Sequence, residues 1–191
     1  MEYNTPKNKI LQENYSKIKK TSVISLIGMT GVGKTTVGKV LSEKLNFGFF
    51  DLDMIITEKT GKSPAEIFAV HGEEFFRQTE TEELENIFEN YNKNFILSCG
   101  GGIVLKGKNR QILKEKSFAV WLLRPIGEIM KNEEIFKRPP INNDINNYVE
   151  IFKRREKLYE ETRDLKIEYT DISEAVENII SSKPLPRRPS V

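Results

Sequence analysis

The chain has 191 residues, of which 38% are hydrophobic and 30% charged, and this composition is typical of a soluble globular protein with one domain. No apolar run approaches the length of a bilayer-spanning helix, and no signal-peptide core follows the N-terminal lysines, so we expect a cytoplasmic protein without a membrane partner. The net charge is +2, with an excess of basic residues in the two terminal segments and an excess of acidic residues between them. Because charged ends are usually solvated tails, we expect no nucleic-acid partner.

The expected strands are short apolar runs without polar alternation. In chain order they occupy residues 23–27, 47–52, 95–99, 118–123 and 166–169. Continuous apolar runs of this length are typical of strands that are buried on both faces of a parallel sheet.

Helical patterns separate these strands. A helix follows residue 33, a capping box at Ser63-Pro64-Ala65-Glu66 starts another, and a charged surface helix is expected over 73–91. Further helices are expected over 108–116, over 148–159 and after Asp171, which would cap the last one. The polar segment 131–147, with its two adjacent prolines, is expected to be a mobile loop.

The alternation of strands and helices predicts an α/β fold, namely a three-layer α/β/α sandwich around a parallel sheet of about five strands. We expect a single domain over residues 21–182. Within it, a substrate-binding helical segment would occupy about 51–80 and a mobile lid about 131–147. Residues 1–20 would form an extension outside the fold, and residues 183–191 a C-terminal tail.

One segment matches the phosphate-loop pattern G-x-x-x-x-G-K-[ST] in full. It consists of Gly28, Met29, Thr30, Gly31, Val32, Gly33, Lys34 and Thr35, with Thr36 directly after it. A strand precedes it and a helix follows, so its backbone N–H groups and the helix N-terminus would converge on phosphates. Lys34 would reach the β- and γ-phosphates, and the Thr35 hydroxyl would bind Mg²⁺. The sequence therefore predicts a P-loop fold with a nucleoside triphosphate site.

Two carboxylates lie where the second expected strand ends, at Asp51 and Asp53. The carboxyl ends of parallel strands share one edge, so both would lie near the phosphate loop and near Gly100–Gly102, which follow the third strand. On an extended chain the two side chains would point to opposite sides, one toward the metal and the attacking hydroxyl, the other toward the remaining substrate hydroxyls. The alternative is that one of them only caps the next helix.

Further motifs follow one another in a fixed order between residues 22 and 181. They are Phe50-Asp51-Leu52-Asp53, Thr60-Gly61-Lys62-Ser63, Ile67-Phe68, Gly72-Glu73, Phe76-Arg77, Glu80, Ser98-Cys99-Gly100-Gly101-Gly102, Lys137-Arg138-Pro139, Arg155 and Leu158-Tyr159. In this register the sequence resembles the shikimate kinase family of P-loop proteins. The resemblance implies transfer of the γ-phosphoryl group of ATP, with Mg²⁺, to the 3-hydroxyl of shikimate, a step of aromatic amino acid biosynthesis, by an enzyme expected to be monomeric.

The resemblance also implies roles at the acceptor side of the site. Arg77 and Arg155 would clamp the carboxylate of shikimate, for which the planar guanidinium group is suited. Asp53 would accept hydrogen bonds from ring hydroxyls, and the backbone of Gly100, Gly101 and Gly102 would approach the substrate closely. Asp51 would lie near the attacking hydroxyl and the Mg²⁺ shell.

Two further residues belong to the lid that the resemblance implies. Lid closure would bring Arg138 onto the transferring phosphate and exclude water. Lys131 takes a position where relatives often have an arginine that stacks on adenine, and lysine is a poorer planar stacker. The N-terminal extension has no counterpart in the family pattern.

Two other functions remain open from the residues alone. A gluconate or nucleotide kinase would share the fold, although such kinases lack the register of Asp51, Asp53, Arg77 and the triple glycine. A non-catalytic nucleotide-binding module would need the phosphate loop but not the arginines. The acceptor that stimulates ADP release distinguishes these functions.

Overall fold

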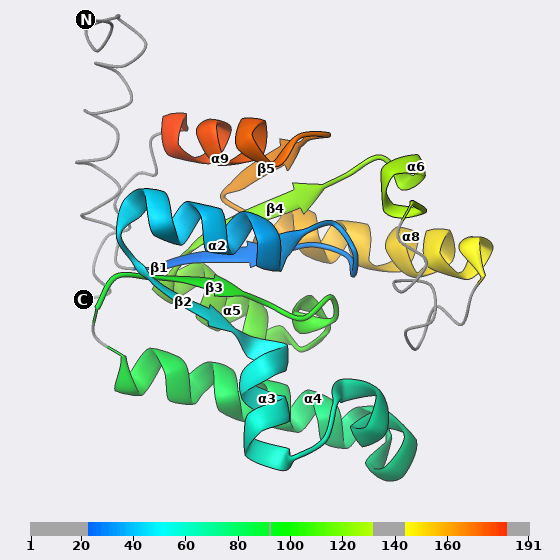
Figure 1. Cartoon of the computed structure of the whole chain (residues 1–191). Coiled ribbons are helices and arrows are strands. Elements are labelled where there is room, and N and C mark those ends of the chain that lie inside the picture. The colour runs from blue at the N-terminus through cyan, green and yellow to red at the C-terminus, as the bar shows by residue number, and fades with distance from the viewer. Residues whose placement is uncertain (1–22, 92, 132–143, 183–191) are drawn as a thin grey trace, which may run out of the picture.

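Five parallel strands form the sheet at the centre of the protein (Figure 1). The computed structural model describes residues 23–91, 93–131 and 144–182. In it the strands are β1 (Val23–Ile27), β2 (Gly48–Asp51), β3 (Phe95–Ser98), β4 (Phe118–Leu123) and β5 (Leu165–Glu168). Their order across the sheet is β2-β3-β1-β4-β5, and every pairing is parallel. The predicted strands and fold class are confirmed.

The three inner strands are buried because helices cover both faces of the sheet. All residues of β1 and β3 are buried, and β1 pairs with β3 on one side and β4 on the other. Branched and aromatic side chains therefore fill both faces, as the apolar runs predicted. One hydrophobic cluster extends from β1 to the last helix.

Among the described elements, helices cover both faces of the sheet (Figure 1). The first pair is α2 (Lys34–Leu45) and α9 (Ile172–Ser181), which contact each other. The opposite set is α4 (Pro64–Asn90), α5 (Gly107–Lys116) and α8 (Ile145–Thr162). Shorter elements are α3 (Leu52–Thr60), η1 (Ile103–Leu105) and α6 (Ile126–Ile129). This is the expected three-layer arrangement.

Helix α4 begins and bends at the places that its sequence predicts. The Ser63 hydroxyl accepts from the Glu66 N–H, and the Glu66 carboxylate accepts from the Ser63 N–H at 2.7 Å, which completes the capping box. Gly72 has a φ of 81° and divides the helix. The prediction of a surface helix over 73–91 is wrong in part, because Arg77 and Glu80 are buried on the side that faces the site.

Helix α8 begins at Ile145, three residues before its expected start, with the Asp144 carboxylate accepting from the Asn146 N–H at 2.8 Å. The end of the expected lid segment is therefore helical. The rest of that segment from 132 to 143, the N-terminal extension and the C-terminal tail lie outside the described residues.

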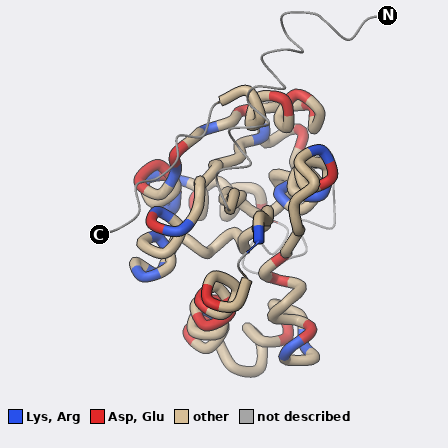
Figure 2. The backbone as a smooth tube through the Cα atoms, turned by 90° about the vertical axis from the view of Figure 1, so that its left-hand side faces the viewer, with Lys and Arg blue, Asp and Glu red and all other residues tan. Residues whose placement is uncertain are grey.

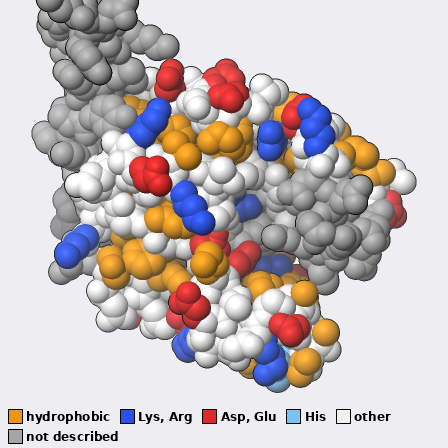
Figure 3. Space-filling view, viewed as in Figure 1, with side chains coloured by type: hydrophobic (Ala, Val, Ile, Leu, Met, Phe, Trp, Pro, Cys, Tyr) orange, Lys and Arg blue, Asp and Glu red, His pale blue; other side chains and the backbone are white. Residues whose placement is uncertain are grey.

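Charged residues belong mainly to the outer helices, whereas the central strands contain almost none (Figure 2). Acidic and basic groups are mixed over the face shown in Figure 3, with apolar side chains between them. Among the helices in the described ranges, none combines the length and the apolar character needed to cross a bilayer.

The N-terminus of α9 offers a test of local stability away from the glycine-rich loops. The Asp171 carboxylate accepts from the N–H groups of Ser173 at 2.8 Å and Glu174 at 3.1 Å. We expect Asp171→Ala to lower the free energy of unfolding by about 1 kcal/mol, measured by urea denaturation, because two amide donors lose their acceptor. Asp171→Asn keeps an acceptor and should lose less. An equal loss in both variants would assign the effect to charge instead of capping.

Candidate active site

The phosphate loop connects β1 to α2 through residues 28–33. Gly28 and Gly33 have backbone φ values of 141° and 89°, which residues other than glycine rarely adopt. A Cβ atom at Gly33 would also lie 2.7 Å from the Tyr169 hydroxyl, so this position leaves no room for a side chain. The side chains of Met29 and Val32 are buried in the core, so these two residues can contribute only their backbone to a ligand.

Lys34 is 8% exposed and lies across its own loop. Its Nζ atom donates to the carbonyl oxygens of Gly28 at 2.9 Å and Met29 at 2.8 Å. These carbonyls hold the ammonium group at the mouth of the loop, beside a cavity of about 380 Å³ that Lys34, Thr35 and Thr36 line. A polyphosphate in that cavity would meet the backbone amides, the ammonium group and the N-terminus of α2 together.

Oxygen atoms that suit a magnesium ion gather beside Thr35. The Thr35 hydroxyl donates to the Asp51 carboxylate at 2.7 Å and lies 3.4 Å from the Ser98 hydroxyl. Among the described residues no group of three acidic, histidine or cysteine side chains could hold a metal. One hydroxyl and one carboxylate are what Mg²⁺ uses when nucleotide phosphates and water complete its shell, so these residues fit the ion.

Contrary to the prediction from the sequence, the two aspartates do not both lie on an extended chain. Asp51 ends β2 and caps α3, because its other carboxylate oxygen accepts from the N–H groups of Asp53 at 3.1 Å and Met54 at 3.3 Å. Asp53 lies in the first turn of α3. Asp51 is therefore the residue that caps α3, and it also contacts Thr35. Asp53 belongs to the helix, so the geometry of an extended chain does not apply to it.

A second cavity of about 420 Å³ adjoins the phosphate cavity. Four residues line both cavities, so the two spaces meet there: Thr30, Asp53, Met54 and Gly101. Arg77 and Arg155 line the second cavity only. A ligand held by the arginines would thus reach toward the phosphate loop past Asp53.

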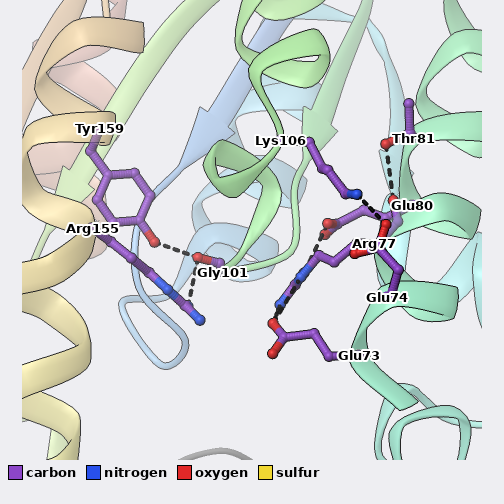
Figure 4. A network of polar contacts seen from close by, with 9 residues as sticks. All are labelled: Glu73, Glu74, Arg77, Glu80, Thr81, Gly101, Lys106, Arg155 and Tyr159. Atoms are coloured by element: carbon purple, nitrogen blue, oxygen red, sulfur yellow. Dashed lines mark hydrogen bonds and ion pairs between the residues drawn. The ribbon is translucent and has the colours of Figure 1, made fainter.

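Arg77 is 6% exposed and is held from several sides (Figure 4). Its Nη1 atom donates to Glu80 at 2.8 Å, and its Nε atom donates to Glu73 at 3.2 Å. The guanidinium carbon lies 5.5 Å from the ring centre of Phe68 and 5.1 Å from that of Phe76. These contacts fix the plane of the guanidinium group in the wall of the cavity.

Glu80 is a site residue whose role the sequence did not reveal, although it was part of the family motif. Its side chain is fully buried, Oε2 accepts from Arg77, and Oε1 has no hydrogen-bond partner among the described residues. Burial raises the pKa of Glu80 to about 7, with Arg77 opposing and Asp53 adding to the rise. Its spacing of three residues from Arg77 on one helix was the available signal.

The triple glycine forms a turn between the two arginines. A Cβ atom at Gly100 would lie 2.6 Å from Glu80 Oε1 and 2.8 Å from Asp53, and one at Gly102 would overlap the Arg77 guanidinium group. The Gly101 carbonyl accepts from Arg155 Nη1 at 3.0 Å and from the Tyr159 hydroxyl (Figure 4). The absence of side chains therefore lets both arginines and both acids approach this turn.

Of the two predicted lid residues, the structure describes Lys131, which lies apart from this arrangement. Lys131 is exposed and pairs with Glu128 at 2.7 Å, and it lines neither cavity. Arg138 lies outside the described residues. The structure thus brings together every other predicted site residue.

Comparisons with known proteins found relatives in one family. The model of the family described as shikimate kinase matches residues 30–183. The chain is 41% identical over 165 residues to the shikimate kinase of Dictyoglomus turgidum, covering 83% of this chain and 95% of the relative. It is 35% identical over 136 residues to that of Clostridium botulinum, covering 71% and 81%.

The chain belongs to the shikimate kinase family. Its fold is similar to that of the shikimate kinase from Acinetobacter baumannii solved in complex with shikimate, with a TM-score of 0.76, 30% identity and coverage of 88% and 93% of the two chains. The Aquifex aeolicus shikimate kinase gives a TM-score of 0.70 at 29% identity, with coverage of 84% and 94%. Family membership makes this chain an ATP-dependent kinase with an alcohol group as acceptor, and confirms the predicted class of enzyme.

The raised pKa of Glu80 predicts a pH-dependent stability. Because this carboxyl binds its proton more tightly in the folded chain, its contribution is present below the ordinary pKa of 4.5 and is lost as the pH rises through about 7. Relative to Glu80→Gln, the wild type should therefore lose about 3 kcal/mol of unfolding free energy between pH 5 and pH 8.

Urea denaturation at a series of pH values measures this difference. Glu73→Gln is the matched control, because Glu73 also pairs with Arg77 but its side chain is 57% exposed, and its pH profile should follow the wild type. If the unfolding free energies of wild type and Glu80→Gln change in parallel with pH, Glu80 does not have a raised pKa.

Proposed function

We propose that this chain transfers the γ-phosphoryl group of ATP to the 3-hydroxyl of shikimate through the two adjoining cavities. The observation that carries the proposal is their junction at Thr30, Asp53 and Gly101, with the phosphate loop on one side and two buried arginines on the other. The relatives named shikimate kinase support this acceptor. The proposed active unit is the monomer that the family resemblance implies.

At the nucleotide end, the loop amides and Lys34 would bind the β- and γ-phosphates. Thr35 and Asp51 would hold Mg²⁺, directly or through water, and the ion would neutralise charge on the phosphates. Asp51 is already fixed by the two amides that it caps and by the Thr35 hydroxyl. A ligand group held in this way loses little conformational entropy when the ion binds.

At the acceptor end, Arg77 and Arg155 would bind the carboxylate of the acid in the larger cavity. Each guanidinium group has five N–H groups and donates only some of them to protein acceptors. The remaining N–H groups can donate to a ligand. Glu80 and the aromatic rings hold Arg77 in place, so the arginine is pre-oriented before the acid arrives. A carboxylate bound to them would form charge-assisted hydrogen bonds that a neutral ligand lacks.

Asp53 would accept the hydrogen bond of the attacking hydroxyl, because it faces both cavities. Asp51 lines only the phosphate cavity, so its proposed role is confined to the metal shell. Catalysis would then rest on alignment of the hydroxyl with the phosphate and on charge stabilisation. Arg138 and Lys131 keep the lid roles that the family resemblance implies.

The first test is ADP release from Mg·ATP in the presence of shikimate, gluconate, AMP or no acceptor. We expect turnover to rise only with shikimate, because only that acid combines a carboxylate for the arginines with a ring hydroxyl for Asp53. Stimulation by gluconate or AMP instead would support kinase activity but would contradict shikimate as the acceptor. Binding of ATP without any stimulated turnover would favour the non-catalytic nucleotide-binding module.

Two neighbouring arginines on α8 give a matched test of the carboxylate site. Arg155 is 8% exposed at the cavity, whereas Arg154 is exposed to solvent. We expect Arg155→Lys to raise the KM for shikimate by about tenfold or more, because lysine lacks the planar fork, without changing the KM for ATP. Arg154→Lys should leave both unchanged. If the Arg155→Lys variant and the wild type have equal KM values for shikimate, Arg155 does not bind the acceptor.

A further inference from the structure

A buried tyrosine hydroxyl contacts the glycine turn from α8. Tyr159 is fully buried, and its hydroxyl donates to the Gly101 carbonyl, which also accepts from Arg155 (Figure 4). The Tyr159 ring stacks on Trp121 with ring centres 5.6 Å apart and planes 19° from parallel. Apolar packing therefore holds the ring, and the hydroxyl is aimed at one backbone carbonyl.

That carbonyl controls the orientation of the next amide. The peptide between Gly101 and Gly102 is planar and trans, so its N–H points away from the oxygen that Tyr159 and Arg155 hold. Gly102 lies against the Arg77 guanidinium group in the wall of the acceptor cavity. Glycine residues by themselves allow many peptide orientations, so a fixed orientation here requires contacts from outside the turn.

Arg155 alone does not supply a constant contact. Its guanidinium group gives one N–H to the Gly101 carbonyl and also lines the acceptor cavity, so an acid that binds the remaining N–H groups would shift it. The Tyr159 hydroxyl is buried and lines neither cavity, so an acid bound there would not contact it. Burial also raises the pKa of Tyr159 to about 12, so the hydroxyl stays a donor across the working range of pH.

The phosphate loop has a counterpart of this contact. Tyr169 is 3% exposed, and its hydroxyl donates to the Val32 carbonyl. Burial raises the pKa of Tyr169 to about 12 as well. Each of these two buried hydroxyls thus fixes one carbonyl in one ligand-binding loop, and the two loops belong to different substrates.

We propose that Tyr159 is a positioning residue for the acid acceptor, acting through the Gly101–Gly102 peptide, and that Tyr169 is its counterpart for the nucleotide. The inference rests on the proposed function for the identity of the acceptor. Neither hydroxyl touches a reacting atom. Each one removes the conformational freedom of a glycine-rich loop before the ligand binds, which lowers the entropy that binding must otherwise overcome.

The test compares Tyr159→Phe with Tyr169→Phe, because each change removes one buried hydroxyl and keeps the ring. With both substrates varied, Tyr159→Phe should raise the KM for shikimate about five- to tenfold and leave the KM for ATP unchanged. Tyr169→Phe should raise the KM for ATP by a similar factor and leave that for shikimate unchanged. In calorimetric titrations, Tyr159→Phe should raise the Kd for shikimate only, and Tyr169→Phe should raise the Kd for Mg·ADP only.

A merely structural role would not divide the substrates in this way. If Tyr159→Phe changes neither KM, or raises both equally, while urea denaturation shows the same loss of stability as Tyr169→Phe, the proposal is overturned.

A readout without substrate separates the inference from the proposed function. By NMR, the Gly102 amide should exchange with solvent faster in Tyr159→Phe than in wild type, and at the wild-type rate in Tyr169→Phe. If the wild type does not phosphorylate shikimate, the proposed function fails, and this exchange comparison still decides the positioning role. Unchanged exchange at Gly102 in Tyr159→Phe would overturn it.

Discussion

The parallel pairing of β1 with β3 brings the two ligand loops of this protein together. Leu26 lies opposite Ser98, and the Cys99 N–H donates to the Leu26 carbonyl at 3.1 Å, so both strands end at one level. The phosphate loop and the glycine turn therefore leave the sheet side by side, and a Cβ atom at Gly101 would lie 2.8 Å from the Thr30 hydroxyl oxygen. Pairing of β2 with β3 adds Asp51 opposite Ser98. The site depends on this register, because a slip of one residue would separate its oxygen atoms.

The charges around the acceptor cavity are expensive to bury and are arranged to compensate one another. Arg77 lies between Glu73 and Glu80, while Arg155 contacts a carbonyl, so neither cation is left without an acceptor. Glu80 is the least compensated group, since burial outweighs the attraction of Arg77. Such a network stabilises the folded chain little, but it holds its donors in one geometry. The free energy lost by burying these charges is offset by function, because fixed guanidinium groups recognise an anionic ligand.

Helix α8 connects the two halves of the site. The Tyr148 hydroxyl donates to the Thr30 carbonyl at 3.1 Å, and two turns later Arg155 and Tyr159 reach the Gly101 carbonyl. These residues lie on one face of the helix because their spacings of seven and four residues match the helical repeat. One rigid element thus contacts the nucleotide loop and the acceptor turn at once.

The sequence by itself determined the strands, the helix caps at Ser63 and Asp171 and the phosphate loop, because apolar periodicity, capping residues and glycine spacing act over a few neighbouring residues. It also determined the family, since the order of the motifs is a property of the chain. Only the tertiary structure decided that Asp51 is the cap and reaches Thr35, that Asp53 faces both cavities, and that Glu80 and Tyr159 support the site. These relations join residues from separate elements, and burial and facing direction arise only when those elements pack around the sheet.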